Sequence, residues 1–261
     1  MNGSVIMSDS SLQPSLKEVE KIIGYEFKNK GLLKEAFTHY TYKDIDCSES
    51  YERLEYLGGS FLNLMIAKEH YLLYPDMTSG ELTRLRAANI DIEALARAAF
   101  KHGLHRFLRH QDHLYDEWIQ ELIEGIKEYP LHSTGLIHSP KIFADILESL
   151  VGVVYVDTNL LVDATWEVVM NLLQPLVIPE NLNLNPVTRF NEMFQKIGIK
   201  SEYKDLWDDR KEIEIYVDEK LIGIGNNKNK KTIAKNKAAA QAYENLAKQL
   251  AMENGAFVYE L

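Results

Sequence analysis

Two pairs of acidic residues each interrupt an otherwise apolar segment. Glu52 and Glu55 stand three residues apart in ERLEYLGGSFLNLMIA, and Asp145 and Glu148 repeat this spacing in FADILESLVGVVYV. Residues three apart share one face of an α-helix, so each pair predicts two carboxylates on a common face. Carboxylates in apolar surroundings need a cation, a basic side chain or backbone donors as partners.

Convergence of the two pairs would create a site made of oxygen ligands. Such ligands favour Mg²⁺ or Mn²⁺ over Zn²⁺, and a site of this kind suits phosphodiester hydrolysis. The alternative interpretation is that each pair is solvated or forms salt bridges with basic residues such as Arg53, Arg84 or Arg86. Spacing alone leaves both interpretations open.

A basic cluster lies near the other end of the chain, in NNKNKKTIAKNKAAAQAYENLAKQL. No acidic residue occurs between Lys220 and Tyr243. Lysines gathered at a helix N-terminus can clamp phosphate groups, although a solvated face of an Ala-rich helix would show the same composition. The lysines concerned are Lys228, Lys230, Lys231, Lys235 and Lys237.

The elements that position these residues fall into two blocks. From Leu16 to Leu173, apolar residues recur at three- and four-residue spacings, which predicts an all-α domain with strongly apolar helices over 52–71 and 143–155. The stretch 174–187 is rich in Pro and Asn, as linkers are. A short helix over 187–197, strands over 212–217 and 220–225 and a long helix over 232–250 then predict a small α+β domain.

Composition indicates a folded protein with an uneven charge distribution. The chain has 261 residues, of which 46% are hydrophobic and 26% charged, and its formal net charge is −10. That charge argues against a generally basic nucleic-acid binder. Residues 184–250, however, hold 13 basic and 10 acidic residues, a net charge of +3, which leaves −13 for the remainder.

Several absences predict the compartment. The single cysteine, Cys47, cannot form an intrachain disulfide, and the N-terminus has no secretion-signal pattern. The sequence contains no run of 18 apolar residues, the length that would predict a membrane-spanning helix. We therefore expect an intracellular protein, in the nucleus or cytoplasm, that does not associate with membranes.

The segment YERLEYLGGSFLNLMIAKEHY resembles the signature of the ribonuclease III family, usually written ERLEFLGD. The resemblance extends through LKEVEKIIGYEFKNKGLLKEAFTHYTY, LTRLRAANIDIEALA and SPKIFADILESLVGVVYVD. The four matching blocks stand in the family's order, and the resemblance covers essentially all of residues 16–178. The sequences and order of these blocks are most similar to those of plant ribonuclease-III-like proteins with one nuclease and one double-stranded RNA-binding domain.

This resemblance implies a homodimer in which the signature helices pack together and the site binds Mg²⁺ or Mn²⁺. It assigns Glu55, Asp145 and Glu148 as metal ligands. Glu52 matches the first acid of the signature, with a substrate-related or structural role. Lys141 matches a lysine often found ahead of the second acidic pair. In the family, both strands of the RNA are cleaved to leave 5′-phosphate and 3′-hydroxyl ends.

The main departure from the family pattern is Gly59, which stands where the signature has an aspartate ligand. Water can fill a Mg²⁺ coordination position but cannot supply the lost charge. We therefore expect weaker metal binding and cleavage reduced by about two orders of magnitude or more. Another family acid falls near Ser79, with Glu81 two positions out of register.

The second domain resembles a double-stranded RNA-binding domain of α-β-β-β-α order. NPVTRFNEM matches its first helix, with Glu192 at the RNA-facing acidic position, and GIGNNKNKKTIAKNKAA matches its Gly-rich turn and Lys-rich second helix. Such domains recognise the shape of A-form RNA. The usual KKxAK spacing is stretched here, and LWDDRK (206–211) replaces the Gly-Pro-x-His loop, so we expect modest, salt-sensitive binding.

Taken together, these patterns predict a disordered N-terminus over 1–14, a nuclease domain over 15–178, a linker over 179–184, an RNA-binding domain over 185–251 and a tail over 252–261. The expected function is metal-dependent cleavage of double-stranded RNA at reduced activity. The alternative is a non-cleaving protein that masks RNA or pairs with an active paralogue.

Overall fold

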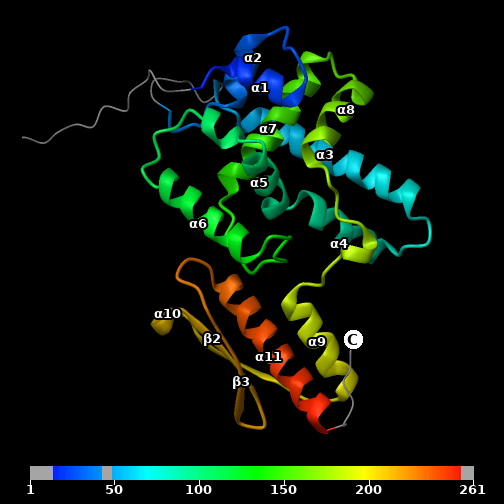
Figure 1. Cartoon of the computed structure of the whole chain (residues 1–261), viewed down its shortest axis with the longest axis vertical. Helices are drawn as coiled ribbons and strands as arrows, with labels where there is room; N and C mark the ends of the chain where they lie inside the picture. Colours follow the sequence, from blue (N-terminus) through cyan, green and yellow to red (C-terminus); the bar gives the residue numbers. More distant parts are fainter. Residues whose placement is uncertain (1–13, 43–48, 254–261) are drawn as a thin grey trace, which may run out of the picture. The chain divides into compact units, whose positions relative to one another are not determined.

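A computed structural model describes residues 14–42 and 49–253. The chain folds into two compact units, Met1–Trp118 with Ser139–Pro179, and Ile119–His138 with Glu180–Leu261 (Figure 1). The expected disorder of residues 1–13, the neighbourhood of Cys47 and the end of the predicted tail lie outside the described residues.

The first unit is helical, as the three- and four-residue spacings predict. The stretch 80–108 divides into two α-helices and one 3-10 turn. Asp91 ends the first of these helices and caps the second, because its side chain accepts a hydrogen bond from the backbone N–H of Ala94 at 2.9 Å. The helices are α1 Leu16–Ile23, α2 Lys30–Ala36, α3 Glu52–Leu73, α4 Ser79–Ile90, α5 Ile92–Lys101, η2 Leu104–Phe107, α7 Lys141–Asp157 and α8 Val162–Leu173.

Helices α3 and α7 cross in direct backbone contact. A Cβ atom on Gly58 would lie 1.8 Å from the carbonyl oxygen of Glu148, and one on Gly152 would lie 2.1 Å from the carbonyl oxygen of Leu54. Neither position has room for any side chain. Two glycines on two helices therefore let the two acidic segments approach one another.

The C-terminal end of α7 is tied to the loop before α2. The carboxylate of Asp157 accepts hydrogen bonds from the Tyr25 hydroxyl at 2.8 Å and from the backbone N–H groups of Lys28 and Asn29, both at 2.9 Å. Burial alone would raise the pKa of Asp157, but these donors outweigh burial and hold that pKa below its ordinary value. Asp157 is thus a buried structural carboxylate with its partners in place.

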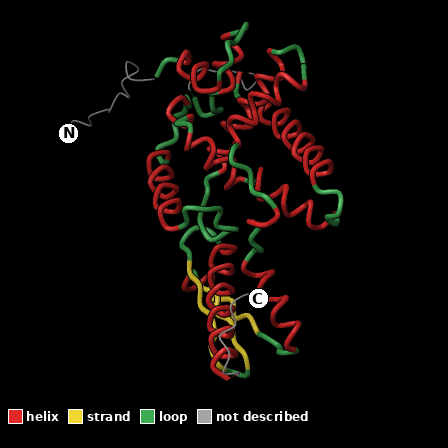
Figure 2. Tube along the Cα trace, turned by 45° about the vertical axis from the view of Figure 1, so that its right-hand side comes forward, coloured by secondary structure: helices red, strands yellow, loops and turns green. Residues whose placement is uncertain are grey.

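The second unit contains a three-stranded antiparallel sheet of order β1-β2-β3. Two α-helices pack on it around Phe190, Ile215 and Ala238. Figure 2 shows the strands, in yellow, lying along the longer helix. The elements are α9 Pro186–Ile197, β1 Glu202–Leu206, α10 Trp207–Arg210, β2 Glu212–Val217, β3 Lys220–Asn226 and α11 Lys231–Glu253, with a 3-10 turn η3 at Pro179–Asn181. Helix α6, Tyr115–Glu128, contributes its residues from Ile119 onward to this unit.

The expected α-β-β-β-α order is confirmed, with α10 as an addition. Most of the segment 206–211, which stands in place of the Gly-Pro-x-His loop, folds as the single helical turn α10, and Lys211 follows this turn in left-handed backbone with φ of 56°. On β3, a Cβ on Gly225 would lie 2.1 Å from the carbonyl oxygen of Ala234. The glycine therefore allows α11 to lie close against the sheet.

Among the described residues, no helix is both long and apolar enough to cross a membrane.

Candidate functional site

Three of the predicted acidic residues meet in one cluster. Glu55 from α3 and Asp145 and Glu148 from α7 each offer a carboxylate oxygen, and these oxygens lie within 4.8 Å of one another. The predicted face-sharing of Asp145 and Glu148 therefore holds in space. Asp145 is buried, whereas Glu55 and Glu148 are partly buried.

The cluster concentrates negative charge in a poorly hydrated place. Burial and the neighbouring carboxylates of Asp145 and Glu55 raise the pKa of Glu148 to about 7, despite the opposing effect of Lys141. Burial also raises the pKa of Asp145 to about 6, although its hydrogen bond from Lys141 acts in the opposite direction. Carboxylates that resist ionisation in this way gain from a bound cation.

Lys141, at the start of α7, is the basic partner of the cluster. Its ammonium group donates hydrogen bonds to Glu55 Oε1 and to Asp145 Oδ1. Burial alone would lower the pKa of Lys141, but these two carboxylates outweigh burial and raise it. The ion pairs of Glu55 and Asp145 are therefore made with this lysine, not with the arginines considered from sequence.

Tyr51 is a residue of this site that sequence analysis missed. Its side chain is 2% exposed, and its hydroxyl donates a hydrogen bond to Asp145 Oδ2 at 3.3 Å. Burial and the nearby Asp145 raise the pKa of Tyr51, so the hydroxyl keeps its proton and acts as a donor. The signal in the sequence is the position of this tyrosine, directly before the signature helix. In the structure the residue is anchored, because its backbone N–H donates a hydrogen bond to the carbonyl of Thr38 at 2.9 Å.

The two adjacent glycines of α3 face different surroundings. Gly58 lies at the backbone contact with α7, whereas a Cβ on Gly59 would lie 2.8 Å from Glu148 Oε1 and 3.4 Å from its Cδ. Position 59 therefore points at the carboxylate cluster. A side chain there would meet only the end of a flexible side chain.

Two other acids lie apart from the cluster. Glu52 is exposed on the first turn of α3, where its Oε2 accepts a hydrogen bond from the Ser50 hydroxyl at 3.2 Å. Glu81 completes a capping box at the start of α4, accepting from the backbone N–H and the hydroxyl of Thr78, both at 2.7 Å. The structure assigns a capping contact to Glu81, and Glu52 contributes no oxygen to the group of three.

The cluster suits a divalent cation. Three carboxylates face one ammonium group, which leaves an excess of negative charge, and the donors are all oxygen atoms. Mg²⁺ and Mn²⁺ prefer such donors. Glu55, Asp145 and Glu148 are the residues that would hold the ion.

The predicted phosphate-binding lysines occupy the turn before α11 and the first turns of that helix. Lys228, Lys230, Lys231 and Lys235 are exposed. The side chain of Asn227 accepts from the backbone N–H groups of Asn229 at 2.9 Å and of Lys230 at 2.7 Å, which shapes the turn.

Two contacts from β1 reach these lysines. Lys231 forms an ion pair with Asp205, and Lys235 Nζ lies 5.0 Å from the centre of the Tyr203 ring. The ion pair of Asp205 places on the basic surface an acid that sequence analysis did not detect.

Glu192, the acid expected at the RNA-facing position of the first helix, is exposed on α9.

Comparison with known proteins agrees with these features. Residues 52–159 match the family described as Ribonuclease III domain, and residues 186–246 match the Double-stranded RNA binding motif. The chain is 42% identical over 238 residues to "Ribonuclease 3-like protein 3" of Oryza sativa subsp. japonica, covering 89% of this chain and 78% of that protein.

Two further relatives are similar over most of this chain. "Ribonuclease 3-like protein 2" of Arabidopsis thaliana is 39% identical over 250 residues, covering 94% of this chain and 63% of that protein. "Endoribonuclease Dicer homolog 1" of Arabidopsis thaliana is 35% identical over 224 residues, covering 83% of this chain but only 12% of that protein. This chain belongs to the ribonuclease III family and joins a ribonuclease III domain to a double-stranded RNA-binding motif.

Proposed function

We propose that this protein binds double-stranded RNA and hydrolyses its phosphodiester bonds internally, at a rate reduced by the glycine at position 59. The observation that carries the proposal is the meeting of Glu55, Asp145 and Glu148 beside Gly59. Three of the four carboxylates that the family resemblance assigns to the metal are in place. The fourth position faces the same cluster without a side chain.

The residues of the site have separable tasks. A bound divalent ion would activate water as the nucleophile and neutralise charge on the phosphate. Glu55, Asp145 and Glu148 would hold that ion. Tyr51 fixes one oxygen of Asp145, which leaves the other oxygen directed at Lys141 and the centre of the cluster.

Lys141 supplies a positive charge inside the cluster. Because its ammonium group bridges Glu55 and Asp145, it holds residues from α3 and α7 in register. Glu55 and Asp145 would have to share their oxygens between that ammonium group and a bound cation. Because position 59 has no aspartate, the cluster has three carboxylates and attracts a divalent cation less strongly than four would. Lys141 therefore keeps its contacts with these oxygens more easily.

A specific observation favours the second candidate function, a non-cleaving RNA-binding protein. Gly59 removes a ligand, while Lys141 already neutralises part of the charge of the remaining carboxylates. Such a protein would mask double-stranded RNA or pair with an active relative. Its RNA-binding unit would operate without the cluster.

Self-association through the ribonuclease III domain is part of the proposal. Tyr56, Leu64 and Tyr71 are 80%, 67% and 73% exposed on α3. Their spacing of eight and seven residues places them along one side of the helix. An exposed apolar stripe of this kind supports a homodimer in which the two copies of α3 pack together.

The deciding experiment incubates long double-stranded RNA with Mg²⁺ or Mn²⁺ and compares the natural protein, Gly59→Asp and Glu148→Gln. We expect slow cleavage by the natural protein, none by Glu148→Gln, and a gain of about 100-fold in Gly59→Asp. Cleavage by Gly59→Asp alone would establish the non-cleaving alternative. Equal cleavage by all three proteins would refute a role for this cluster.

A further inference from the structure

Within the second unit, the segment 121–138 is hydrogen-bonded to the basic turn before α11. The side-chain amide of Asn229 donates to Glu121 Oε1 at 3.0 Å. The other carboxylate oxygen of Glu121 lies 2.8 Å from His138 Nδ1, at the far end of the same segment. Asn229 stands between Lys228 and Lys230 in the sequence, so the carboxylate of Glu121 contacts the turn that carries these two lysines.

A second contact joins the loop of this segment to the N-cap of α9 and to α11. The carbonyl oxygen of Thr134 accepts a hydrogen bond from Asn185 Nδ2 at 3.0 Å, and that of Gly135 accepts one from Asn236 Nδ2 at 2.8 Å. Asn185 is the N-cap of α9, and Asn236 lies on α11 between two of the lysines. The loop therefore bridges the starts of the two helices that the resemblance assigns to RNA binding.

The loop backbone is shaped for this contact. Thr134 and Gly135 have φ values of 54° and 91°, in the left-handed region, which turns their successive carbonyl groups toward one side. A Cβ on Gly135 would lie 2.6 Å from Asn236 Nδ2. Glycine at this position thus permits both the backbone conformation and the close approach to α11.

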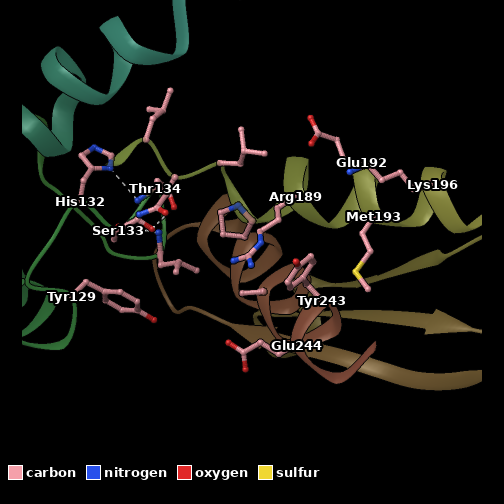
Figure 3. A pocket seen from close by; sticks show the side chains of 16 residues that line it. Tyr129, His132, Ser133, Thr134, Arg189, Glu192, Met193, Lys196, Tyr243 and Glu244 are labelled. Atoms are coloured by element: carbon pink, nitrogen blue, oxygen red, sulfur yellow. Dashed lines mark hydrogen bonds between the residues drawn. The ribbon is translucent and has the colours of Figure 1, made fainter. Parts of the chain in front are cut away.

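The docked loop leaves an open cavity of about 660 Å³ beside it. Figure 3 shows Thr134 on one side of this space and Arg189, Glu192 and Tyr243 on the other. The guanidinium group of Arg189 lies 4.0 Å from the centre of the Tyr243 ring. A contact made by a few polar hydrogen bonds around an open space is one that a charged ligand can displace.

We propose that the segment 121–138 is a built-in competitor of double-stranded RNA for the surface formed by the starts of α9 and α11. This inference rests on the RNA-binding part of the proposed function. Glu121 takes the place of an RNA phosphate beside the lysine turn, and the loop carbonyls occupy two asparagines that flank the binding surface. An RNA duplex must release these contacts to reach the lysines, so its affinity is lower than the lysines alone would give.

The test measures binding of the full chain to a fluorescent RNA duplex of about 30 base pairs, roughly twice the span of one such domain. A chelator removes divalent cations so that the duplex is not cleaved. We expect Glu121→Gln to tighten binding by about threefold to tenfold, because it keeps the size of the side chain but removes the charge. Glu124→Gln is the matched control, since Glu124 is exposed on the same helix and its side chain makes no hydrogen bond or ion pair with the described residues. It should change affinity by less than about twofold.

A second variant and a second measurement separate docking from charge. Gly135→Ala removes the loop contact without altering any charge, and it should also tighten binding. Hydrogen exchange of residues 129–138 should rise in both variants, and in the natural protein when RNA is added. The competition is refuted if Glu121→Gln behaves like Glu124→Gln or binds more weakly than the natural protein. Failure of every protein to bind the duplex would instead reject the proposed function and the inference together.

Discussion

The carboxylate cluster and the lysine surface both depart from the family pattern, but the departures act differently. Gly59 removes one side chain from a site whose other groups are fixed by the backbone contact of α3 and α7. That crossing therefore holds the three carboxylates near one another. On the lysine surface, the altered segment folds into α10, and Asp205 pairs with a lysine. There the change affects local structure and charge together.

The difference follows from what holds each site in place. The cluster stands on two helices in direct backbone contact, and its hydrogen bonds involve buried groups such as Tyr51 and Asp145. The lysine surface consists of long exposed side chains at the end of a helix, where ion pairs are weakened by solvent and salt. A site held by packed backbone can lack one side chain with little movement, whereas an exposed surface is tuned by its charges.

The largest effect is expected at the helix crossing. Gly58→Ala should lower the free energy of unfolding by about 3 kcal/mol, because the new methyl group collides with the carbonyl oxygen of Glu148. Gly59→Ala, the matched control one residue later, should change it by less than about 1 kcal/mol, because alanine favours the helix and Glu148 can move its carboxylate. Urea unfolding measures both. Equal destabilisation would show that α3 and α7 do not cross at Gly58.

The second effect concerns Asp157, the buried carboxylate at the end of α7. Asp157→Asn should lower the free energy of unfolding by about 2 kcal/mol, because an amide cannot accept hydrogen bonds from all three donors. The pKa of Asp157 is lowered in the folded protein, so its contribution is complete above the unfolded value of about 4 and is lost as the pH falls through the folded pKa. Urea unfolding of the unaltered protein and of Asp157→Asn at a series of pH values measures this contribution to the free energy of unfolding. A difference that grows as the pH falls would contradict the assignment.

The contribution of Tyr51 can be separated from general packing. Tyr51→Phe should weaken Mn²⁺ binding by about threefold, because Asp145 loses the donor that fixes one of its oxygens. Tyr56→Phe is the matched control, since Tyr56 is 80% exposed on α3, the helix that begins directly after Tyr51. Titration with Mn²⁺, followed by its paramagnetic signal, measures both affinities. Equal affinity of the two variants would remove Tyr51 from the site.

The smallest effect is expected on the lysine surface. Asp205→Asn should tighten binding of an RNA duplex by about twofold and lose this advantage at high salt, because it releases Lys231 from an exposed ion pair. Asp208→Asn removes the same charge from the exposed turn α10 and serves as its control. Binding isotherms at several salt concentrations measure both. An identical gain in the two variants would show that total charge, and not the pair with Lys231, sets the affinity.

Most of the helical pattern could be predicted because apolar spacing is a local property. The spacing also placed Asp145 and Glu148 on one helix face, and the structure confirms it. The strands over 212–217 and 220–225 were predicted with boundaries within one residue. β1 had no located prediction, because its EYKDL sequence lacks a strong apolar alternation.

The sequence by itself determined which residues could form each site and at which position the family resemblance expects a further carboxylate. Glu55, Asp145, Glu148 and the absent side chain at Gly59 can be identified from motif and spacing. Only the tertiary structure decided that the carboxylates meet, because that depends on the close crossing at Gly58 and Gly152. It also decided that Tyr51 supports Asp145 and that Glu121 reaches the lysine turn. These partners are far apart in the chain, and their distances are set by packing, which no local pattern encodes.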